Sequence, residues 1–179
     1  GSIRTVLEDS KGRLWVGTEY DGVNLLDPET GQFIRYGHDP GNDKSIGDDY
    51  VRFILEADDG KLWLATFDGG ISIFDPETEQ ASRLTGTSSN RVRTLMKDDN
   101  GDIWAGTNGG LNLWRPQTET FDVFSQDPTD VHSMSDNKVI EIYQDAGGVI
   151  WVGTFNGLSK WNAQTEIFPH IRQSSVGKI

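Results

Sequence analysis

The sequence predicts an all-β protein assembled from four copies of one repeat, on three observations. A seven-residue stretch centred on a tryptophan recurs along the 179 residues as GRLWVGT (12–18), GKLWLAT (60–66), GDIWAGT (101–107) and GVIWVGT (148–154). Between these stretches, short apolar segments alternate with turns rich in Asp, Asn and Gly. The 21 glycines and 18 aromatic residues suit many tight turns joining strands whose large side chains fill a core.

Composition limits the classes of partner that this chain can have. The formal net charge is −12, and an acidic surface repels nucleic acid and anionic lipid, so we expect neither nucleic-acid binding nor direct membrane contact. The absence of Cys excludes disulfides, thiolate zinc sites and a Cys nucleophile. The pair Gly1-Ser2 resembles a cloning remnant and the chain starts inside a repeat, so we expect a piece of a longer protein without its targeting segments.

Each repeat begins with an apolar segment, at 3–8, 51–56, 92–97 and 139–144. Apolar residues stand twelve and nine places before each tryptophan: Ile3 and Val6, Val51 and Ile54, Val92 and Leu95, Val139 and Ile142. On a regular strand these two positions point to opposite faces. The segments are therefore expected to be strands that are buried on both faces.

A tight turn and the tryptophan strand come next. The turns read DSKG, DDG, DDNG and DAGG, in which Asp and Asn bond their own backbone and Gly supplies a positive φ. Two places after the tryptophan stands a small residue: Gly17, Ala65, Gly106 or Gly153. A small residue inside a strand indicates that another strand approaches closely there.

The second half of each repeat predicts two further strands, one after a Gly-rich turn and one after a turn such as DPETGQ. A single four-stranded antiparallel sheet cannot cover both of its faces, so successive sheets must stack on one another. Radial stacking predicts a β-propeller of four four-stranded antiparallel blades, either a partial propeller or a fragment of a larger one. We place the blades at about 3–37, 50–85, 91–125 and 138–172, in a single unit spanning 1–179.

One rim of this propeller is the expected binding face, because polar linkers and Gly-rich turns from every blade converge on the axis there. A first group of candidate ligand contacts is basic or aromatic and belongs to the innermost strands: Arg4, Arg52 and Arg93, preceded by Tyr50, Arg91 and Lys138. Such a row suits an anionic ligand. The alternative, which we favour, is that these residues pair with nearby acidic residues: Asp48, Asp49, Glu56, Asp136 and Glu141.

A second group of candidates lies in the Gly-rich turns: Tyr20, Phe67, Asn108 and Phe155. These side chains either stack on a ligand or cap the core beneath the loops. The repeated tryptophans could form a sugar-stacking platform, but their fixed register favours packing between blades: Trp15, Trp63, Trp104 and Trp151.

Catalysis and metal binding have little support in the sequence. The segment 98–102 resembles the start of a calcium loop but lacks the distal Glu, so an Asx turn is preferred. The three histidines, His38, His132 and His170, stand in no catalytic motif. We therefore expect no catalytic residue, no metal and no cofactor.

The repeat resembles the two-component regulator propeller repeat. The shared pattern is Val-x-x-Ile, then Asp-x-x-Gly-x-Leu-Trp-Val-Gly-Thr, Gly-Gly-Leu-Asn and Asp-Pro-x-Thr-Gly-x-Phe, and the linkers HDPGNDKSIGDDYV and QDPTDVHSMSDNKV also match. The resemblance covers essentially the whole chain. The departures are few: Ala57, Ala65, Ala81, Arg115, Ala146 and Asn162.

The resemblance implies a sensor. Members of this family resemble large periplasmic receptors with many such repeats, a β-sandwich domain, a membrane span and an output module, commonly a histidine kinase or a diguanylate cyclase. It implies a periplasmic location and ligands that are breakdown products of polysaccharides, without catalysis in the propeller itself. Together with the basic row, it leads us to expect a carbohydrate or other small anionic ligand. Two alternatives stay open, a propeller enzyme of the lyase or glycosidase kind acting on polysaccharide, and a protein-interaction or dimerisation scaffold.

If the ring does not close, the two end blades of a four-blade piece each expose an apolar face, which drives association. The four blades could close as a ring on their own, remain an open arc, or pair with a second chain. We favour self-association of two chains into an eight-blade ring, which satisfies the rule of closed symmetry.

Overall fold

The computed structural model describes residues 1–162, 165 and 167–171, and these contain sixteen β-strands in four separate antiparallel sheets. The all-β fold of four four-stranded blades is confirmed. Blade 1 contains β1 (Ile3–Glu8), β2 (Leu14–Thr18), β3 (Val23–Leu26) and β4 (Phe33–Tyr36). Blade 2 contains β5 (Val51–Glu56), β6 (Leu62–Thr66), β7 (Ile71–Asp75) and β8 (Gln80–Leu84). Blade 3 contains β9 (Val92–Lys97), β10 (Ile103–Thr107), β11 (Leu111–Arg115) and β12 (Thr120–Phe124). Blade 4 contains β13 (Val139–Gln144), β14 (Ile150–Thr154), β15 (Gly157–Lys160) and β16 (His170–Ile171).

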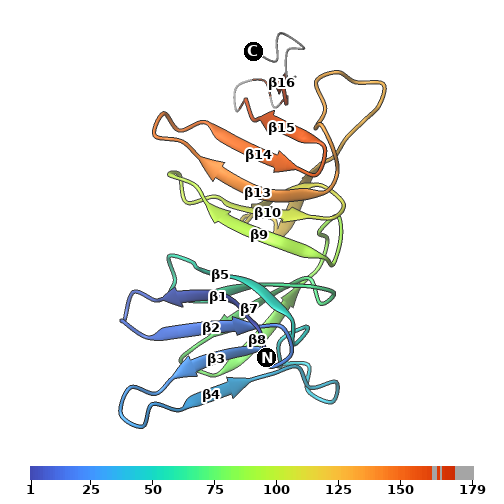
Figure 1. Cartoon of the computed structure of the whole chain (residues 1–179). Coiled ribbons are helices and arrows are strands. Elements are labelled where there is room, and N and C mark those ends of the chain that lie inside the picture. Colours follow the sequence, from blue (N-terminus) through green and yellow to red (C-terminus); the bar gives the residue numbers. More distant parts are fainter. Residues whose placement is uncertain (163–164, 166, 172–179) are drawn as a thin grey trace, which may run out of the picture.

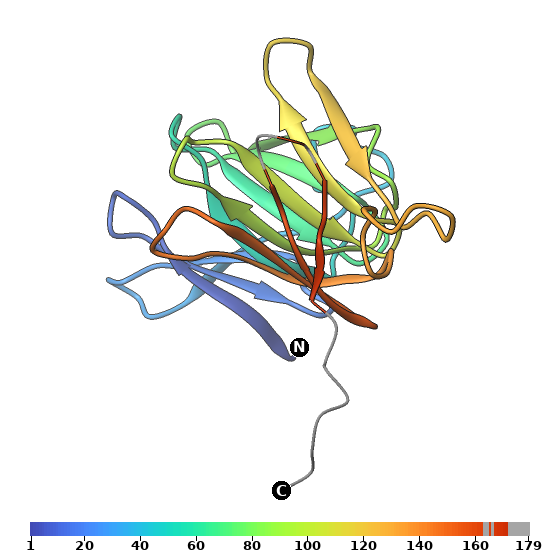
Figure 2. The same ribbon diagram turned by 90° about the horizontal axis from the view of Figure 1, so that it is seen from above.

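The four blades follow one another along an open arc, with blades 1 and 4 at its two ends (Figure 1). The innermost strands lie side by side in the order β1, β5, β9, β13. Figure 2 shows the same arc from above, with the sheets rotated relative to one another. Of the last blade assigned from the sequence, residues 163–164, 166 and 172 lie outside the described residues.

Each contact between neighbouring blades is built from one repeated set of side chains. We call the face that a blade turns towards the following blade its forward face, and the face towards the preceding blade its backward face. The forward face carries the tryptophan, and the backward face of the next blade carries the apolar residues of its innermost strand. Trp15 packs with Val51 and Ile54 in this way, and a Cβ at Gly17 would lie 3.0 Å from Val51 Cγ1. The small residue after the tryptophan therefore does permit the close approach that the sequence predicts.

The predicted orientation of the innermost strands is wrong in one respect. Val51 and Ile54 were expected on opposite faces, but both pack against blade 1. The reason is a β-bulge between Val51 and Phe53, which places one extra residue in β5 and reverses the alternation that follows. The same irregularity occurs in β1, β9 and β13.

The two ends of the arc leave one face of each terminal blade without a neighbour. On the backward face of blade 1, Ile3 is 63% exposed and Val6 is 56% exposed, whereas Val51 at the position of Ile3 is 0% exposed. On the forward face of blade 4, Tyr143 and Leu158 are exposed. Within the described part of the chain, no helix is long and apolar enough to cross a lipid bilayer.

Candidate functional site

The β-bulge of each innermost strand falls on the residue eleven places before the tryptophan. In the first three blades this residue is Arg4, Arg52 or Arg93, and in blade 4 it is Ile140. A bulge leaves its extra residue outside the regular ladder and changes the direction of its side chain. The three arginines predicted from the sequence therefore occupy the bulge positions of blades 1 to 3, at the end where the linkers meet the Gly-rich turns.

An aromatic stack lies at the centre of this row. Tyr50 precedes β5, Phe67 follows β6, and the Phe67 N–H donates to the Tyr50 carbonyl over 3.0 Å. Their rings are stacked, with centroids 5.2 Å apart and planes 15° apart. The guanidinium carbon of Arg52 lies 5.1 Å from the Tyr50 centroid and 4.6 Å from the Phe67 centroid. Cation–π contacts of this kind orient the guanidinium without neutralising its charge.

Two further arginines extend the stack into neighbouring blades. Arg4 of blade 1 lies 5.2 Å from the Tyr50 ring centroid, and Arg91, which precedes β9, lies 4.9 Å from that of Phe67. Blades 1, 2 and 3 thus all contribute to one surface. We call it the basic–aromatic cluster, and it consists of Arg4, Tyr50, Arg52, Phe67, Arg91 and Arg93.

The arginines of the cluster differ in how their charge is balanced. Arg4 pairs with Glu19, and Arg91 Nε donates to Asp68 over 2.9 Å. Arg93 Nε donates to the neutral Asn108 Oδ1 over 2.7 Å. Among the described residues Arg52 makes no ion pair, and its Nε is buried without a hydrogen-bond partner. The acidic partners in the structure are therefore different residues from those considered in the sequence, and one cationic side chain at the centre has none.

Mutual repulsion within the cluster is visible in the pKa of Arg93. Burial lowers this pKa, and the nearby charges of Arg52 and Arg91 lower it further. Burial and like-charge neighbours both disfavour the protonated form. A bound anion would favour the protonated form and offset this repulsion, so the arrangement is suited to a negatively charged ligand.

The remaining candidate residues lie at the edge of the cluster or apart from it. Tyr20 is exposed and donates its hydroxyl to Glu19, which raises the pKa of the Tyr20 hydroxyl. Lys138 lies 4.6 Å from the ring of Phe155 in blade 4 and forms a separate pair. The sequence interpretation did not include Glu19 and Asp68. The sequence signal that could have identified them is that each stands directly beside an aromatic residue of a Gly-rich turn, Tyr20 or Phe67.

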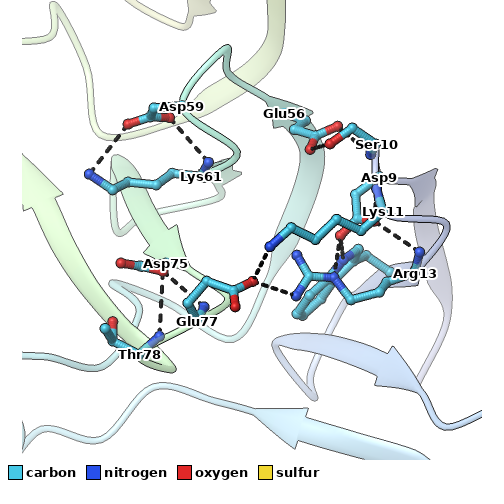
Figure 3. A network of polar contacts seen from close by, with 11 residues as sticks. Asp9, Ser10, Lys11, Arg13, Glu56, Asp59, Lys61, Asp75, Glu77 and Thr78 are labelled. Carbon is cyan, nitrogen blue, oxygen red and sulfur yellow. Dashed lines mark hydrogen bonds and ion pairs between the residues drawn. The ribbon is translucent and has the colours of Figure 1, made fainter.

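A different polar motif recurs at the opposite end of the strands. In blade 1, Asp9 Oδ2 accepts from the Trp15 indole N–H over 2.8 Å, and Oδ1 accepts from the backbone N–H groups of Lys11 and Arg13. Burial raises the pKa of Asp9, but these hydrogen bonds outweigh it and leave the pKa below its usual value. Figure 3 shows Arg13 between Asp9 and Glu77 of blade 2.

The same Asp–Trp bond occurs in blades 3 and 4, at 2.9 Å between Asp98 and Trp104 and at 2.8 Å between Asp145 and Trp151. In blade 4 the indole N–H of Trp151 is the main cause that lowers the pKa of Asp145. Asp98 bonds within its own turn, as an Asx turn does. The described residues contain no group of three or more His, Cys, Asp or Glu side chains placed to hold a metal ion.

The family model for the two-component regulator propeller matches residues 1–20, 86–109 and 133–156. These segments hold the innermost and tryptophan strands of blades 3 and 4 and the start of blade 1. The resemblance read from the sequence is confirmed for these segments, which match the two-component regulator propeller repeat. A comparison with curated proteins gives no match.

Several solved structures share the fold. The extracellular domain of a hybrid two-component system from B. thetaiotaomicron is 29% identical, with a TM-score of 0.74 over 96% of this chain and 22% of that chain. The extracellular domain of a one-component system from the same organism is 25% identical, with a TM-score of 0.76 over 89% of this chain and 21% of that chain. Virginiamycin B lyase from Staphylococcus aureus is 13% identical, with a TM-score of 0.66 over 92% of this chain and 54% of that chain, which shows the fold alone. The chain thus spans about a fifth of the length of the two extracellular domains.

Proposed function

We propose that this chain belongs to the extracytoplasmic sensor domain of a bacterial signal-transduction receptor and binds a small anionic ligand at the basic–aromatic cluster. The observation that carries the proposal is Arg52, a cation stacked on two aromatic rings with no carboxylate partner among the described residues. The similarity to extracellular domains of bacterial signalling systems supports the sensor role and the location. A periplasmic placement and an output through a histidine kinase or a diguanylate cyclase are parts of the same proposal.

The chemistry of the cluster favours an acidic carbohydrate. The rings of Tyr50 and Phe67 lie beside the guanidinium of Arg52, whose donors fit a carboxylate or sulfate. Because Arg4 and Arg91 come from the neighbouring blades, a ligand held by all three would favour one arrangement of blades 1 to 3. Such a differential affinity is the requirement for a ligand to shift a conformational equilibrium.

Affinity measurements on matched variants test the site. We expect Arg52→Ala to weaken binding of a uronic-acid disaccharide by about 10-fold or more, because a hydrogen bond to a charged group contributes about 1.5–3 kcal/mol. The control is Arg115→Ala, which removes the same charge from the outer part of blade 3, where Arg115 pairs with Asp122. Isothermal titration would overturn the proposal if both variants bound as wild type does, or if a neutral disaccharide bound equally well.

An enzymatic role has weaker support. The likeness to a lyase rests on 13% identity and concerns the fold. The two carboxylates next to the cluster, Glu19 and Asp68, are each paired with an arginine of the cluster. A paired carboxylate is poorly placed to act as a general base, which needs a pKa near the operating pH.

We also propose that a second copy of the chain completes the arc. The exposed forward face of blade 4 corresponds to the faces of blades 1 to 3 that carry Trp15, Trp63 and Trp104. The exposed backward face of blade 1 corresponds to the faces of blades 2 to 4 against which these tryptophans pack. The chain spans 54% of the lyase propeller chain and 52% of the WD40 propeller domain of Doa1. Four blades therefore amount to about half of each of these two propeller chains.

Light scattering after gel filtration measures this pairing. We expect a molar mass of about 40 kDa, twice the 19.9 kDa of one chain, since a two-fold pair buries both end faces. Tyr143→Lys places a charge on the end face of blade 4 and is expected to return the mass to that of one chain. A wild-type mass of one chain would refute the pairing, and polydisperse association would show that the faces bind without closing a ring.

A further inference from the structure

A cavity of about 780 Å³ opens between blades 2 and 3, at the end of the strands opposite the basic–aromatic cluster. Its lining includes the turn between β5 and β6, together with Trp63 of β6 and Trp114 of β11. The two indole rings meet edge to face, with centroids 5.7 Å apart and planes 72° apart. Its volume lies in the range of cavities that hold small ligands, about 300–1,000 Å³.

The equivalent place between blades 1 and 2 shows what normally occupies this position. There the carboxylate of Asp9 bonds the Trp15 indole N–H and two backbone N–H groups of its own turn. Arg13 Nε balances its charge at 2.6 Å and also bonds Glu77 of the neighbouring blade (Figure 3). The carboxylate is thus the centre of a network that fills the space between the blades.

Blade 2 keeps the frame of this network but lacks its carboxylate. Ala57 stands at the position of Asp9, and its turn has the same backbone bonds, from Ala57 N to Lys61 O and from Gly60 N to Ala57 O, both over 2.9 Å. The corresponding bonds in blade 1 measure 2.9 and 2.8 Å. The turn is therefore held in the conformation that binds a carboxylate, although the side chain that would supply it is missing.

The indole donor of this frame remains available. Trp63 is 4% exposed and lines the cavity, and its indole N–H makes no hydrogen bond within the described residues, unlike those of the other three repeat tryptophans. The backbone N–H of Lys61 is taken by the Asp59 side chain, which is exposed. Lys61 also stands at the position of Arg13 and lies 3.3 Å from Asp59 (Figure 3).

We propose that this cavity binds a small carboxylate, such as a sugar acid, whose carboxylate takes the place of the missing Asp side chain. It accepts from the indole N–H of Trp63, and Lys61, which also pairs with Asp59, supplies positive charge beside it. The body of the ligand lies against Trp114. A ligand carboxylate would supply the acceptor that the Trp63 indole N–H lacks within the described residues, through a charge-assisted hydrogen bond. The site is separate from the basic–aromatic cluster and does not depend on it.

Nitrogen-15 NMR of the indole N–H signals tests the proposal. The chain has six tryptophans, and the signal of Trp63 is the one lost in Trp63→Phe. Sodium acetate, sodium glucuronate and glucose are titrated at pH 7 and constant ionic strength. Both carboxylates are expected to move the Trp63 signal, glucuronate at lower concentration, while glucose leaves it unchanged. Movement with glucose equal to that with glucuronate would overturn the proposal.

Ala57→Asp places a carboxylate where blades 1, 3 and 4 have an Asp, and it is the most discriminating variant. We expect its Trp63 signal to lie near the bound position without any ligand, and glucuronate binding to weaken by about 10-fold or more. Undiminished binding by this variant would overturn the proposal. In Arg52→Ala the Trp63 signal should still respond to glucuronate as in the wild type. If this response were lost in Arg52→Ala, carboxylate binding would be assigned to the basic–aromatic cluster instead. If Ala57→Asp does not fold, the wild-type titration still decides, because an unmoved Trp63 signal in saturating acetate refutes the site.

Discussion

Replacing Trp104 with alanine is expected to lower the free energy of unfolding by about 3–5 kcal/mol, the usual effect of removing a large buried aromatic side chain. Trp104 is buried between blades 3 and 4, edge to face with Trp161 at 5.6 Å and stacked on Phe124 at 6.2 Å. Its indole N–H also bonds the carboxylate of Asp98 over 2.9 Å. The variant therefore leaves both a cavity and a buried carboxylate with one donor fewer.

Urea unfolding followed by circular dichroism measures this loss. Tyr20→Ala is the control, because its ring is 66% exposed on a Gly-rich turn, and we expect a change within about 0.5 kcal/mol. Since small domains are stable by about 5–15 kcal/mol, Trp104→Ala should remove a large part of the total. Equal effects of the two substitutions would show that the repeat tryptophans do not hold neighbouring blades together.

Replacing Gly22 with alanine is expected to destabilise the protein by about 2–5 kcal/mol, through two effects that add. Gly22 has φ of 69°, in the left-handed region, where a Cβ costs about 1–2 kcal/mol. A Cβ at this position would also lie 2.3 Å from the carbonyl oxygen of Tyr36, so the backbone of β4 must shift. The Gly22 N–H donates to the Asp49 carbonyl over 2.9 Å, and that shift would disturb the contact between turn and linker.

Gly31→Ala separates the two effects. Gly31 has φ of 70°, almost the same as Gly22, but a Cβ there meets nothing within 4 Å. We expect a loss of only about 1–2 kcal/mol, from the backbone conformation alone. The difference between the variants in thermal or urea unfolding measures the clash with β4. If Gly31→Ala were as damaging as Gly22→Ala, the close approach would not be the cause.

The blades were predictable from the sequence because their signals are local and are repeated four times. The turn glycines, the small residue after each tryptophan and the apolar strand positions each describe a contact within one blade or with the next. The error concerned Val51 and Ile54, which share a face because of the bulge at Arg52. A bulge changes the alternation by one residue, and nothing in the residue types of this strand marks it.

The candidate sites were only partly predictable. The basic row was visible as a spacing, but the stacking of Tyr50 on Phe67 and the pairing of Arg91 with Asp68 join residues of different elements. The candidate site between blades 2 and 3 depends on the absence of a carboxylate side chain at position 57. Ala57 appeared in the sequence as a departure from the repeat, and its consequence emerged only once Trp63 was seen without the acceptor that its counterparts have.

The most direct test of the proposed sensor site is a crystal structure of the chain with a uronic-acid disaccharide bound. We expect the carboxylate within hydrogen-bond distance of the Arg52 guanidinium, about 2.7–2.9 Å, and the sugar against the Tyr50 and Phe67 rings. A disaccharide bound with its carboxylate away from Arg52, or one bound only in the cavity beside Trp63, would contradict the assignment of the basic–aromatic cluster as the sensor's ligand site.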